Sequence, residues 1–221
     1  IRDRLLTLFT LQATAKPIPV LLFNYDFGGD RLIDVTYADG THSKIDAGNG
    51  LLFGGGAIWD FYQKTDFNLQ LQSNIAYKFQ SVKEASNGNG SWDHIPFEVL
   101  GYYNHHTLPI RAGVGLTYQF GNKFKGSGFL EPYTTKFKNT TGSIIDVDYK
   151  YEKYYFGLRA TNIEYKSEST GKSVSGNSIG LTFSMTFPEV SSAAAPSIAE
   201  PQETDSKTEK SINTQKSEKH K

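Results

Sequence analysis

The feature that most constrains the fold of this chain is a side-chain pattern with a period of two residues. Between 108 and 120, for example, the apolar Ile110 and Val114 alternate with the polar Arg111 and Thr117. Successive residues of a β-strand point to opposite sides of the sheet, so such a segment is a strand with one apolar and one polar face. No segment of comparable length has the 3.6-residue period of a helix. The sequence therefore predicts an all-β fold.

The number and spacing of these segments predict an eight-stranded antiparallel up-and-down β-barrel. The expected strands are 22–37, 50–61, 67–80, 96–104, 108–120, 135–151, 154–166 and 177–187. Short turns alternate with longer loops rich in glycine, serine and asparagine, which we expect at 38–49, 82–94, 121–134 and 167–176. Transmembrane barrels have an even number of strands, short periplasmic turns and long external loops. In the first strand, Gly28-Gly29 predicts a β-bulge.

The polar faces of these strands favour a transmembrane barrel over a soluble, lipocalin-like one. A soluble barrel turns its apolar face inward and shows a densely charged face to water. Here the polar faces hold mostly amide, hydroxyl and glycine residues with few charges, which suits a narrow interior. Aromatic residues near the expected strand ends predict girdles at the membrane interfaces. These residues are Trp59, Phe61, Tyr103, Tyr151, Tyr154 and Tyr155.

The two ends of the chain differ from the barrel segment 16–187. Residues 1–15 hold two arginines, an apolar run and Ala13-Thr14-Ala15, which predict the remnant of a secretory signal. A short amphipathic helix is the alternative for this segment. Residues 188–221 contain almost no large apolar side chain, so we expect a disordered periplasmic tail. A contact of the tail with peptidoglycan or a periplasmic partner is a further hypothesis.

The overall composition excludes several classes of function. The 221 residues carry no net charge, so no overall basic field suggests a nucleic-acid partner. The chain has no cysteine, which excludes disulfides, thiolate metal sites and a cysteine nucleophile. Outside the N-terminus the chain has no apolar run long enough for a helix that spans a membrane.

Charged residues on the polar faces form the principal candidate site. They are Glu98, Arg111, Asp146, Asp148, Lys150, Glu152 and Arg159. The interior of an eight-stranded barrel is just wide enough for side chains to fill it, and buried charges must be paired. We therefore interpret the set as a charge network in the lumen. The alternative is a conduction path lined by Arg111, Arg159, Asp146 and Asp148.

Other candidates for chemistry are weaker. A serine–histidine–acid site of an outer-leaflet hydrolase would have to draw on His42, Ser43, Ser91, Asp93 and His94, all in expected external loops. His105-His106 is better explained as an interfacial pair than as a metal site, because adjacent strand residues point to opposite faces. Gly54-Gly55-Gly56 lacks the Lys-Ser/Thr of a phosphate-binding loop and indicates close strand packing or a bend. We expect no catalytic residue, cofactor or metal.

Several short motifs resemble those of known outer-membrane barrels. Segment 180–187, GLTFSMTF, is similar to the closing strand that the barrel-assembly machinery recognises, with Gly180, Phe183, Met185 and Phe187 as its marks. A tail after this phenylalanine is found in OmpA-type proteins. The glycine-rich segments 28–32, 47–50, 54–56, 125–128 and 176–183 resemble an uncharacterised family of small proteobacterial outer-membrane barrels, and the likeness to OmpA-like and OmpW-like eight-stranded barrels spans about 20–187.

Together these observations predict an integral protein of the Gram-negative outer membrane. The leading hypothesis is a non-enzymatic structural or surface-interaction role without a wide, porin-like pore. The alternatives are a narrow channel for small solutes or ions and, third, a lipid-modifying hydrolase. The expected partners are outer-membrane lipids and, during biogenesis, the barrel-assembly machinery, with no nucleic acid.

Overall fold

The computed structural model describes residues 16–36, 39–84, 88–128 and 133–187, and the account below concerns these residues. Within them the chain forms strands and no helix, so no helix is long and apolar enough to cross a membrane. The all-β prediction is confirmed. The predicted signal remnant 1–15 and the predicted tail 188–221 lie outside the described residues.

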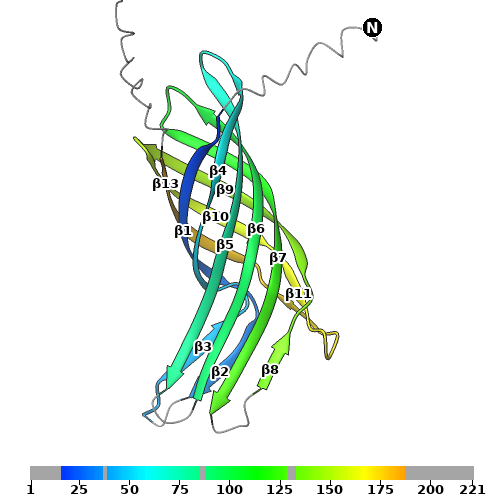
Figure 1. Cartoon of the computed structure of the whole chain (residues 1–221). Helices are drawn as coiled ribbons and strands as arrows, with labels where there is room; N and C mark the ends of the chain where they lie inside the picture. Colours follow the sequence, from blue (N-terminus) through cyan, green and yellow to red (C-terminus); the bar gives the residue numbers. More distant parts are fainter. Residues whose placement is uncertain (1–15, 37–38, 85–87, 129–132, 188–221) are drawn as a thin grey trace, which may run out of the picture. The chain divides into compact units, whose positions relative to one another are not determined.

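The main sheet is a closed antiparallel barrel (Figure 1). Of its nine strands, β8 pairs with β7 alone, and the other eight form a ring that the β6–β7 pairing closes. In chain order the ring strands are β1 (Ile18–Gly28), β4 (Gly50–Gln63), β5 (Phe67–Glu84), β6 (Gly88–His105), β7 (Ile110–Gly128), β9 (Thr140–Tyr151), β10 (Tyr154–Asn162) and β13 (Ser178–Thr186). The predicted eight-stranded up-and-down barrel is therefore confirmed.

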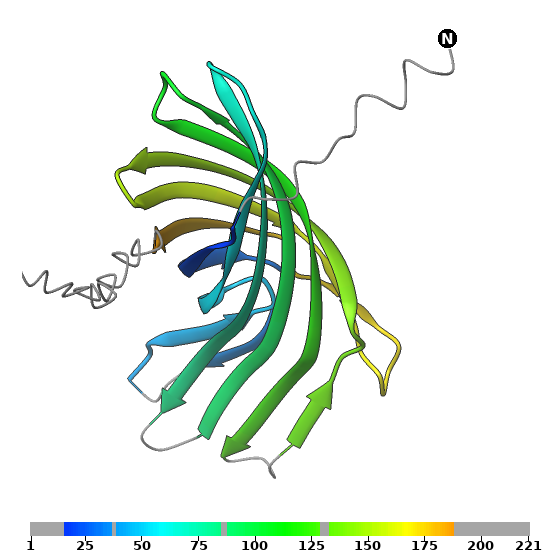
Figure 2. The ribbon, with the colours of Figure 1, turned by 45° about the horizontal axis from the view of Figure 1, so that its top comes forward.

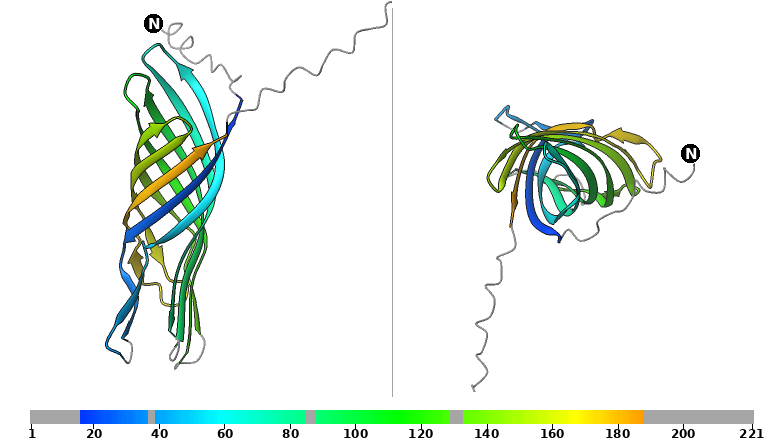
Figure 3. Two further views of the ribbon diagram at one scale, coloured as in Figure 1. Left: turned by 90° about the vertical axis from the view of Figure 1, so that its left-hand side faces the viewer. Right: turned by 90° about the horizontal axis from the view of Figure 1, so that it is seen from above.

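The first and last ring strands pair with each other, so no edge remains in the ring. β1 and β13 are antiparallel in register from Val20 with Thr186 to Gly28 with Ser178. Figure 3 shows the two strands, blue and orange, side by side along the wall. On its other side β1 pairs with β4, and β13 pairs with β10. This arrangement satisfies the backbone donors and acceptors of every strand within the ring itself.

The apolar faces of the strands point outward and the polar faces point inward. On β7, the outward Val114 is 65% exposed, whereas the inward Arg111 is 1% exposed. The predicted orientation is thereby confirmed, and a lipocalin-like core is excluded. From Ile110 to Phe120 of β7 the extended chain advances about 34 Å. With strands tilted by roughly 40° this is about 26 Å along the barrel axis, close to the apolar band of about 25 Å in outer-membrane barrels.

Exposed aromatic pairs lie near both ends of the apolar belt. Near the short turns, the rings of Phe67 and Tyr103 stack with centroids 5.1 Å apart. Near the loop end, the rings of Tyr77 and Phe79 stack at 5.7 Å. One aromatic residue expected in a girdle is placed differently: Tyr155 points inward and is buried. Tyr155 is the second residue of β10, after the two-residue turn that follows Tyr151, and it occupies a position that points inward. Closeness to the end of a strand does not show to which side a residue points.

Two of the predicted loops are in fact strands, and one predicted strand is divided. β5 and β6 pair as far as Glu84 with Gly88, and β7 continues to Gly128, so most of 82–94 and 121–134 is sheet. The predicted strand 22–37 ends as β1 at Gly28, where φ is 131°. Left-handed backbone at Gly28 and Gly29 turns the chain out of the ring.

Short strands surround these extensions at the loop end of the barrel (Figure 2). β2 (Arg31–Thr36) and β3 (His42–Asp46) form one hairpin, and β11 (Glu164–Lys166) pairs with β12 (Ser173–Ser175). β8 (Tyr133–Lys136) extends the sheet beside β7. The predicted strands 135–151 and 154–166 are thus each divided, and the predicted loops 38–49 and 167–176 contain strand segments. We call this part of the molecule the outer extension.

The glycine run 54–56 allows β4 to lie close to β5. A Cβ added to Gly56 would overlap the carbonyl oxygen of Ser73, and one added to Gly54 would overlap the side chain of Ala76. The space is limited by backbone, which cannot rotate away. This contact agrees with the interpretation of the run as a site of close strand packing.

Substitution of this run tests the packing. Gly56→Ala is expected to lower the free energy of unfolding by about 1–3 kcal/mol, because the added methyl group forces the strands apart. Urea titration of the folded protein in micelles, followed by gel mobility, measures the change. The matched control is Gly101→Ala, since the nearest atom to a Cβ there is 4.0 Å away. Equal losses for both variants would contradict this account.

Candidate functional site

The candidate site is the lumen, whose charged side chains form a hydrogen-bonded network. At its centre, Arg159 on β10 is 4% exposed. Its Nε donates to Asp146 Oδ2 on β9 at 3.0 Å, and its Nη1 donates to Glu98 Oε1 on β6 at 3.0 Å. One guanidinium thus holds two carboxylates from two different strands. Because all three side chains are buried, each needs the others as partners.

A second ion pair lies nearer the short turns. Arg111 Nε on β7 donates to Asp148 Oδ2 on β9 at 2.7 Å. The guanidinium carbon of Arg111 lies 4.1 Å from the ring centroid of Tyr102 and 3.8 Å from that of Tyr155. A cation between two aromatic faces is stabilised electrostatically, most strongly where water is excluded. This stacking explains why Tyr155 points into the lumen.

Amide side chains join the two ion pairs into one chain of hydrogen bonds. Arg111 Nη1 donates to Gln72 Oε1 at 3.2 Å, and Gln72 Nε2 donates to Asn74 Oδ1 at 3.1 Å. Asn74 Nδ2 then donates to Glu98 Oε2 at 3.4 Å. Because Glu98 binds Arg159, the network runs from Asp148 across β7, β5, β6 and β10 and returns to β9 at Asp146. It therefore ties five ring strands together across the lumen.

A third ion pair lies nearer the loop end. Lys78 Nζ on β5 is 2.7 Å from Asp26 Oδ2 on β1, and it also donates to the carbonyl oxygen of Gly48 at 2.7 Å. The Asp26 carboxylate lies over Gly180 of β13, where a Cβ would overlap Asp26 Oδ1. Gly180, predicted as a mark of the closing strand, therefore also has a packing role at the β1–β13 contact.

An apolar cluster lies in the outer extension beyond this ion pair. We call it the outer core, and it consists of Ile45, Ala47, Trp92, Phe124, Phe137, Ile163 and Tyr165. Trp92 Nε1 donates to the carbonyl oxygen of Ala47 at 3.0 Å. The rings of Phe137 and Tyr165 each meet the Trp92 ring edge to face, with centroids 5.1 Å away. Strands from several sides of the barrel thus meet in one apolar contact at its outer end.

Polar groups border the outer core on its lumen side. The Tyr165 hydroxyl donates to Gln119 Oε1. Burial raises the pKa of Tyr165 well above the ordinary range, so the hydroxyl stays protonated at neutral pH. The His94 ring lies beside Trp92 and Tyr165, and neither of its nitrogens has a hydrogen-bond partner among the described residues.

The structure brings together most, but not all, of the charged residues predicted for the lumen. Glu98, Arg111, Asp146, Asp148 and Arg159 belong to the network described above. Lys150 is half-buried and forms no ion pair with a described residue. Glu152 is exposed in the turn after β9, where its φ of 53° takes the chain off the strand and its side chain out of the lumen.

Four members of the lumen site were not named by the sequence analysis. Gln72 and Asn74 are amide residues on the polar face of β5, and only their partners on other strands show that they link the ion pairs. Lys78 lies on the same face of β5, and its partner Asp26 lies in β1 just before the interruption at Gly28-Gly29. Because β4 separates β5 from β1 in the ring, a search for opposite charges on directly paired strands would not have found this last pair.

The residues marked in the closing strand lie on both sides of the barrel wall. Gly180 is inward, while Phe183 and Met185 are outward and half-buried, and Phe187 is exposed just after β13. The Phe183 ring packs against Phe156 of β10 with centroids 5.2 Å apart. β13 closes the ring, but recognition of these residues by the assembly machinery stays a prediction.

The candidate hydrolase residues are not assembled within the described part of the chain. Ser91 Oγ donates to Asp93 Oδ2 at 3.3 Å, but this pair bonds to no described histidine. His42 is exposed and meets Thr36 through its Nδ1, while His94 is buried below the outer core. Across the described ranges no three His, Cys, Asp or Glu side chains are grouped so that they could hold a metal ion.

A closed eight-stranded ring, a belt of apolar side chains outside and paired charges inside define the architecture of small outer-membrane barrels. No protein-family model and no curated protein matches the sequence. Among solved structures, the chain is similar to Ail, the attachment invasion locus protein of Yersinia pestis, at 12% identity and a TM-score of 0.43, over 78% of this chain and 99% of that one.

Two further solved structures are similar to the chain. Neisserial surface protein A matches at 12% identity and a TM-score of 0.42, over 77% of this chain and 97% of that one. The outer membrane protein AlkL, studied in lipid bilayers, matches at 13% identity and a TM-score of 0.35, over 80% of this chain and 92% of that one. Likenesses this distant transfer no ligand and no residue role to this chain.

Loss of the central cation tests the lumen network. Arg159→Met is expected to lower the free energy of unfolding in micelles by about 3–5 kcal/mol, because it leaves Glu98 and Asp146 buried without a partner. Adding Glu98→Gln and Asp146→Asn should restore part of the loss. The control Lys125→Met removes an exposed cation and should change stability by less than about 0.5 kcal/mol. If Arg159→Met is as stable as the control, the network does not stabilise the fold.

Proposed function

We propose that this chain is an integral protein of the Gram-negative outer membrane that acts through its outer extension, with the barrel as a non-conducting anchor. The observation that carries the proposal is the filled lumen, in which three ion-paired groups and the outer core follow one another along the axis. A membrane location is supported by the apolar belt, because lipid accepts apolar side chains and a strand ring without an edge. The role is structural or one of surface interaction, and it is not enzymatic.

A filled lumen favours an anchor over a pore. To pass an ion, the barrel would have to separate at least one of the pairs formed by Arg111, Arg159 and Lys78. Separation of a buried pair is costly because each charge then lacks its partner. The outer core would also have to open, since its apolar side chains offer no partner to a hydrated ion.

A narrow channel is the second candidate, and one observation favours it. Several buried polar atoms near the loop end of the lumen have no hydrogen-bond partner among the described residues, including Asp26 Oδ1 and Thr117 Oγ1. Such atoms attract water, and a line of water molecules could conduct protons or small ions.

Conductance separates these two candidates. In planar lipid bilayers the wild-type protein is expected to give no stable ohmic steps, because its lumen charges are paired. The Arg159→Met variant, refolded to the same gel mobility, provides the comparison. Stable wild-type steps whose size changes in that variant would establish the channel and refute the anchor. Absence of steps in both proteins is the result that the anchor requires.

The orientation of the barrel provides a separate test of the membrane proposal. An epitope inserted at Gly40 in the β2–β3 turn should bind antibody on intact cells, because this exposed glycine has no atom within 4 Å of an added Cβ. The matched insertion at Thr65, in the short turn between β4 and β5, should bind only after permeabilisation. Whole-cell flow cytometry measures both. Labelling of Thr65 on intact cells would contradict the proposed topology.

A further inference from the structure

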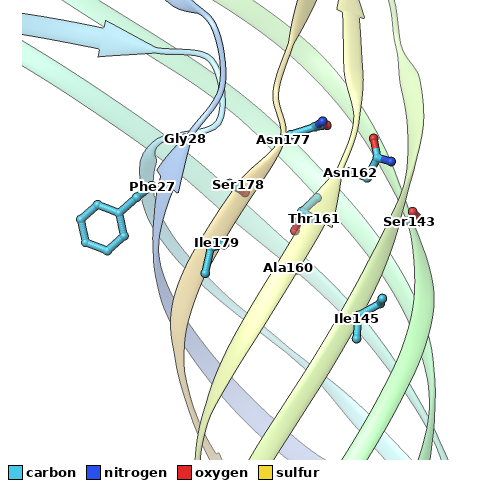
Figure 4. Close-up of a pocket in the computed structure, with 10 residues that line it drawn as sticks. All are labelled: Phe27, Gly28, Ser143, Ile145, Ala160, Thr161, Asn162, Asn177, Ser178 and Ile179. Atoms are coloured by element: carbon cyan, nitrogen blue, oxygen red, sulfur yellow. The ribbon is translucent and has the colours of Figure 1, made fainter.

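The outer face of the barrel has a groove at the boundary between the apolar belt and the outer extension (Figure 4). Its volume is about 670 Å³, and it spans β1, β13, β10 and β9. Its lining includes the small side chains of Ala160 and Ser143 and, further toward the belt, Ile145 and Ile179. Ile145 and Ile179 are 59% and 66% exposed, so the groove opens outward and not into the lumen.

The composition of the groove changes from apolar to polar along the barrel axis. Toward the loop end its lining includes the amides of Asn162 and Asn177. Asn162 is opposite Ser143 in the β9–β10 register, so polar groups from two strands meet there. No charged side chain lines the groove. An apolar chain with a neutral polar head portion fits such a lining better than an ion does.

Five lysines lie on the outward face just beyond the groove. We call them the lysine patch: Lys123, Lys125, Lys136, Lys138 and Lys166. Backbone pairing makes the patch continuous, because Lys123 is opposite Lys136 in the β7–β8 register. The amide of Lys138 also donates to the carbonyl oxygen of Lys166 at 2.8 Å. Cations from β7, β8, β11 and the segment before β9 are therefore neighbours.

The lysine patch has an excess of positive charge. None of its lysines forms an ion pair with a described carboxylate, whereas Arg31 and Lys44 of the β2–β3 hairpin are both paired with Asp46. Two exposed carboxylates, Glu164 and Glu168, lie on the same side of the extension and reduce the excess without removing it. Like charges opposite each other in a sheet are destabilising, so an anion that binds between them is favoured.

Patch and groove are aligned along one strand direction. Ala160, Asn162, Glu164 and Lys166 are successive outward positions of β10 and β11. The four residue steps from Asn162 to Lys166 advance about 13 Å. A ligand with an apolar chain beside Ala160 and an anionic group near Lys166 could therefore contact both sites at once.

The geometry points to a binding site for a phosphorylated glycolipid of the outer leaflet, and this inference rests on the proposed membrane location. Its acyl chain lies in the groove, its sugar meets Asn162 and Asn177, and its phosphate groups meet the lysine patch. A lipid is the occupant because the groove lies on the apolar belt, which faces acyl chains in a membrane. Phosphate is the anionic group that such a lipid presents to clustered lysines at the membrane surface.

The test compares lipids that differ only in phosphate. The folded full chain in micelles is titrated with diphosphorylated lipid A or with its dephosphorylated form, and retention is measured by native mass spectrometry. The phosphorylated lipid is expected to bind about a hundredfold more tightly than the dephosphorylated one. Equal binding of the two lipids would overturn the role of the lysine patch.

Variants separate the two parts of the site. K136Q/K138Q/K166Q is expected to weaken binding of the phosphorylated lipid by about a hundredfold, and the matched triple K44Q/K64Q/K153Q should leave it unchanged. Ala160→Phe, which fills the groove, should weaken binding of both lipids, whereas Ile75→Phe on β5, across the ring from β10, should not. The site would be refuted if both lysine triples weakened lipid binding equally, or if both phenylalanine substitutions did.

Two further measurements separate a glycolipid site from a site for free phosphate and from a failure of membrane insertion. Inorganic phosphate at the concentration of the lipid should not compete, and full competition would reassign the patch to a free anion. Each variant is also refolded into lipid vesicles and checked for the gel mobility of the folded barrel. A wild-type chain that fails to insert would refute the membrane proposal. A chain that inserts but binds neither lipid refutes only the glycolipid site.

Discussion

The pairing of β1 with β13 is the constraint on which the rest of the structure depends. Without it the sheet would have two edges of unpaired backbone groups, which the hydrocarbon region of a membrane does not tolerate. Closure fixes which face of every strand is outside, because a strand cannot rotate within a ring without exposing its polar face. It also explains why Gly180 stands opposite Asp26, since a larger residue there would displace the first strand from the last.

Because the apolar faces point outward, the interior is polar, and its buried polar side chains need hydrogen-bond or ion-pair partners. A ring of eight strands encloses too little space for bulk water, so the inward side chains must satisfy one another. The network that leaves β9 at Asp148 and returns to it at Asp146 satisfies its carboxylates with two arginines and two amides. Buried ion pairs often add little net stability compared with apolar packing, but a lost partner is costly. The network therefore disfavours any register in which these partners separate.

The alternation of side chains predicted the architecture because a period of two is a local property of the chain. It placed Arg111, Asp146 and Arg159 on inward positions without knowledge of their partners. The outer core could not be predicted in this way. Trp92 bonds to Ala47, which is 45 positions away, and neither neighbourhood shows a long apolar alternation. The segments around Trp92 and Phe124 therefore read as polar loops, although long-range packing extends them as strands. Tyr155 was misplaced for a similar reason, because its attraction to Arg111 depends on a partner from another strand.

The two sides of the outer extension differ in net charge. The described cations of the β2–β3 hairpin are neutralised within it by Asp34 and Asp46, so that side offers hydrogen-bonding groups with little net charge. The β7, β8 and β11 side keeps its lysines free of described carboxylate partners. Both sides are joined to the same closed ring, the hairpin through β1 and β4 and the lysine side through β7, β9 and β10. In the proposed membrane location the lysine side would lie at the level of lipid headgroups, and the neutral hairpin would be the side presented to solution.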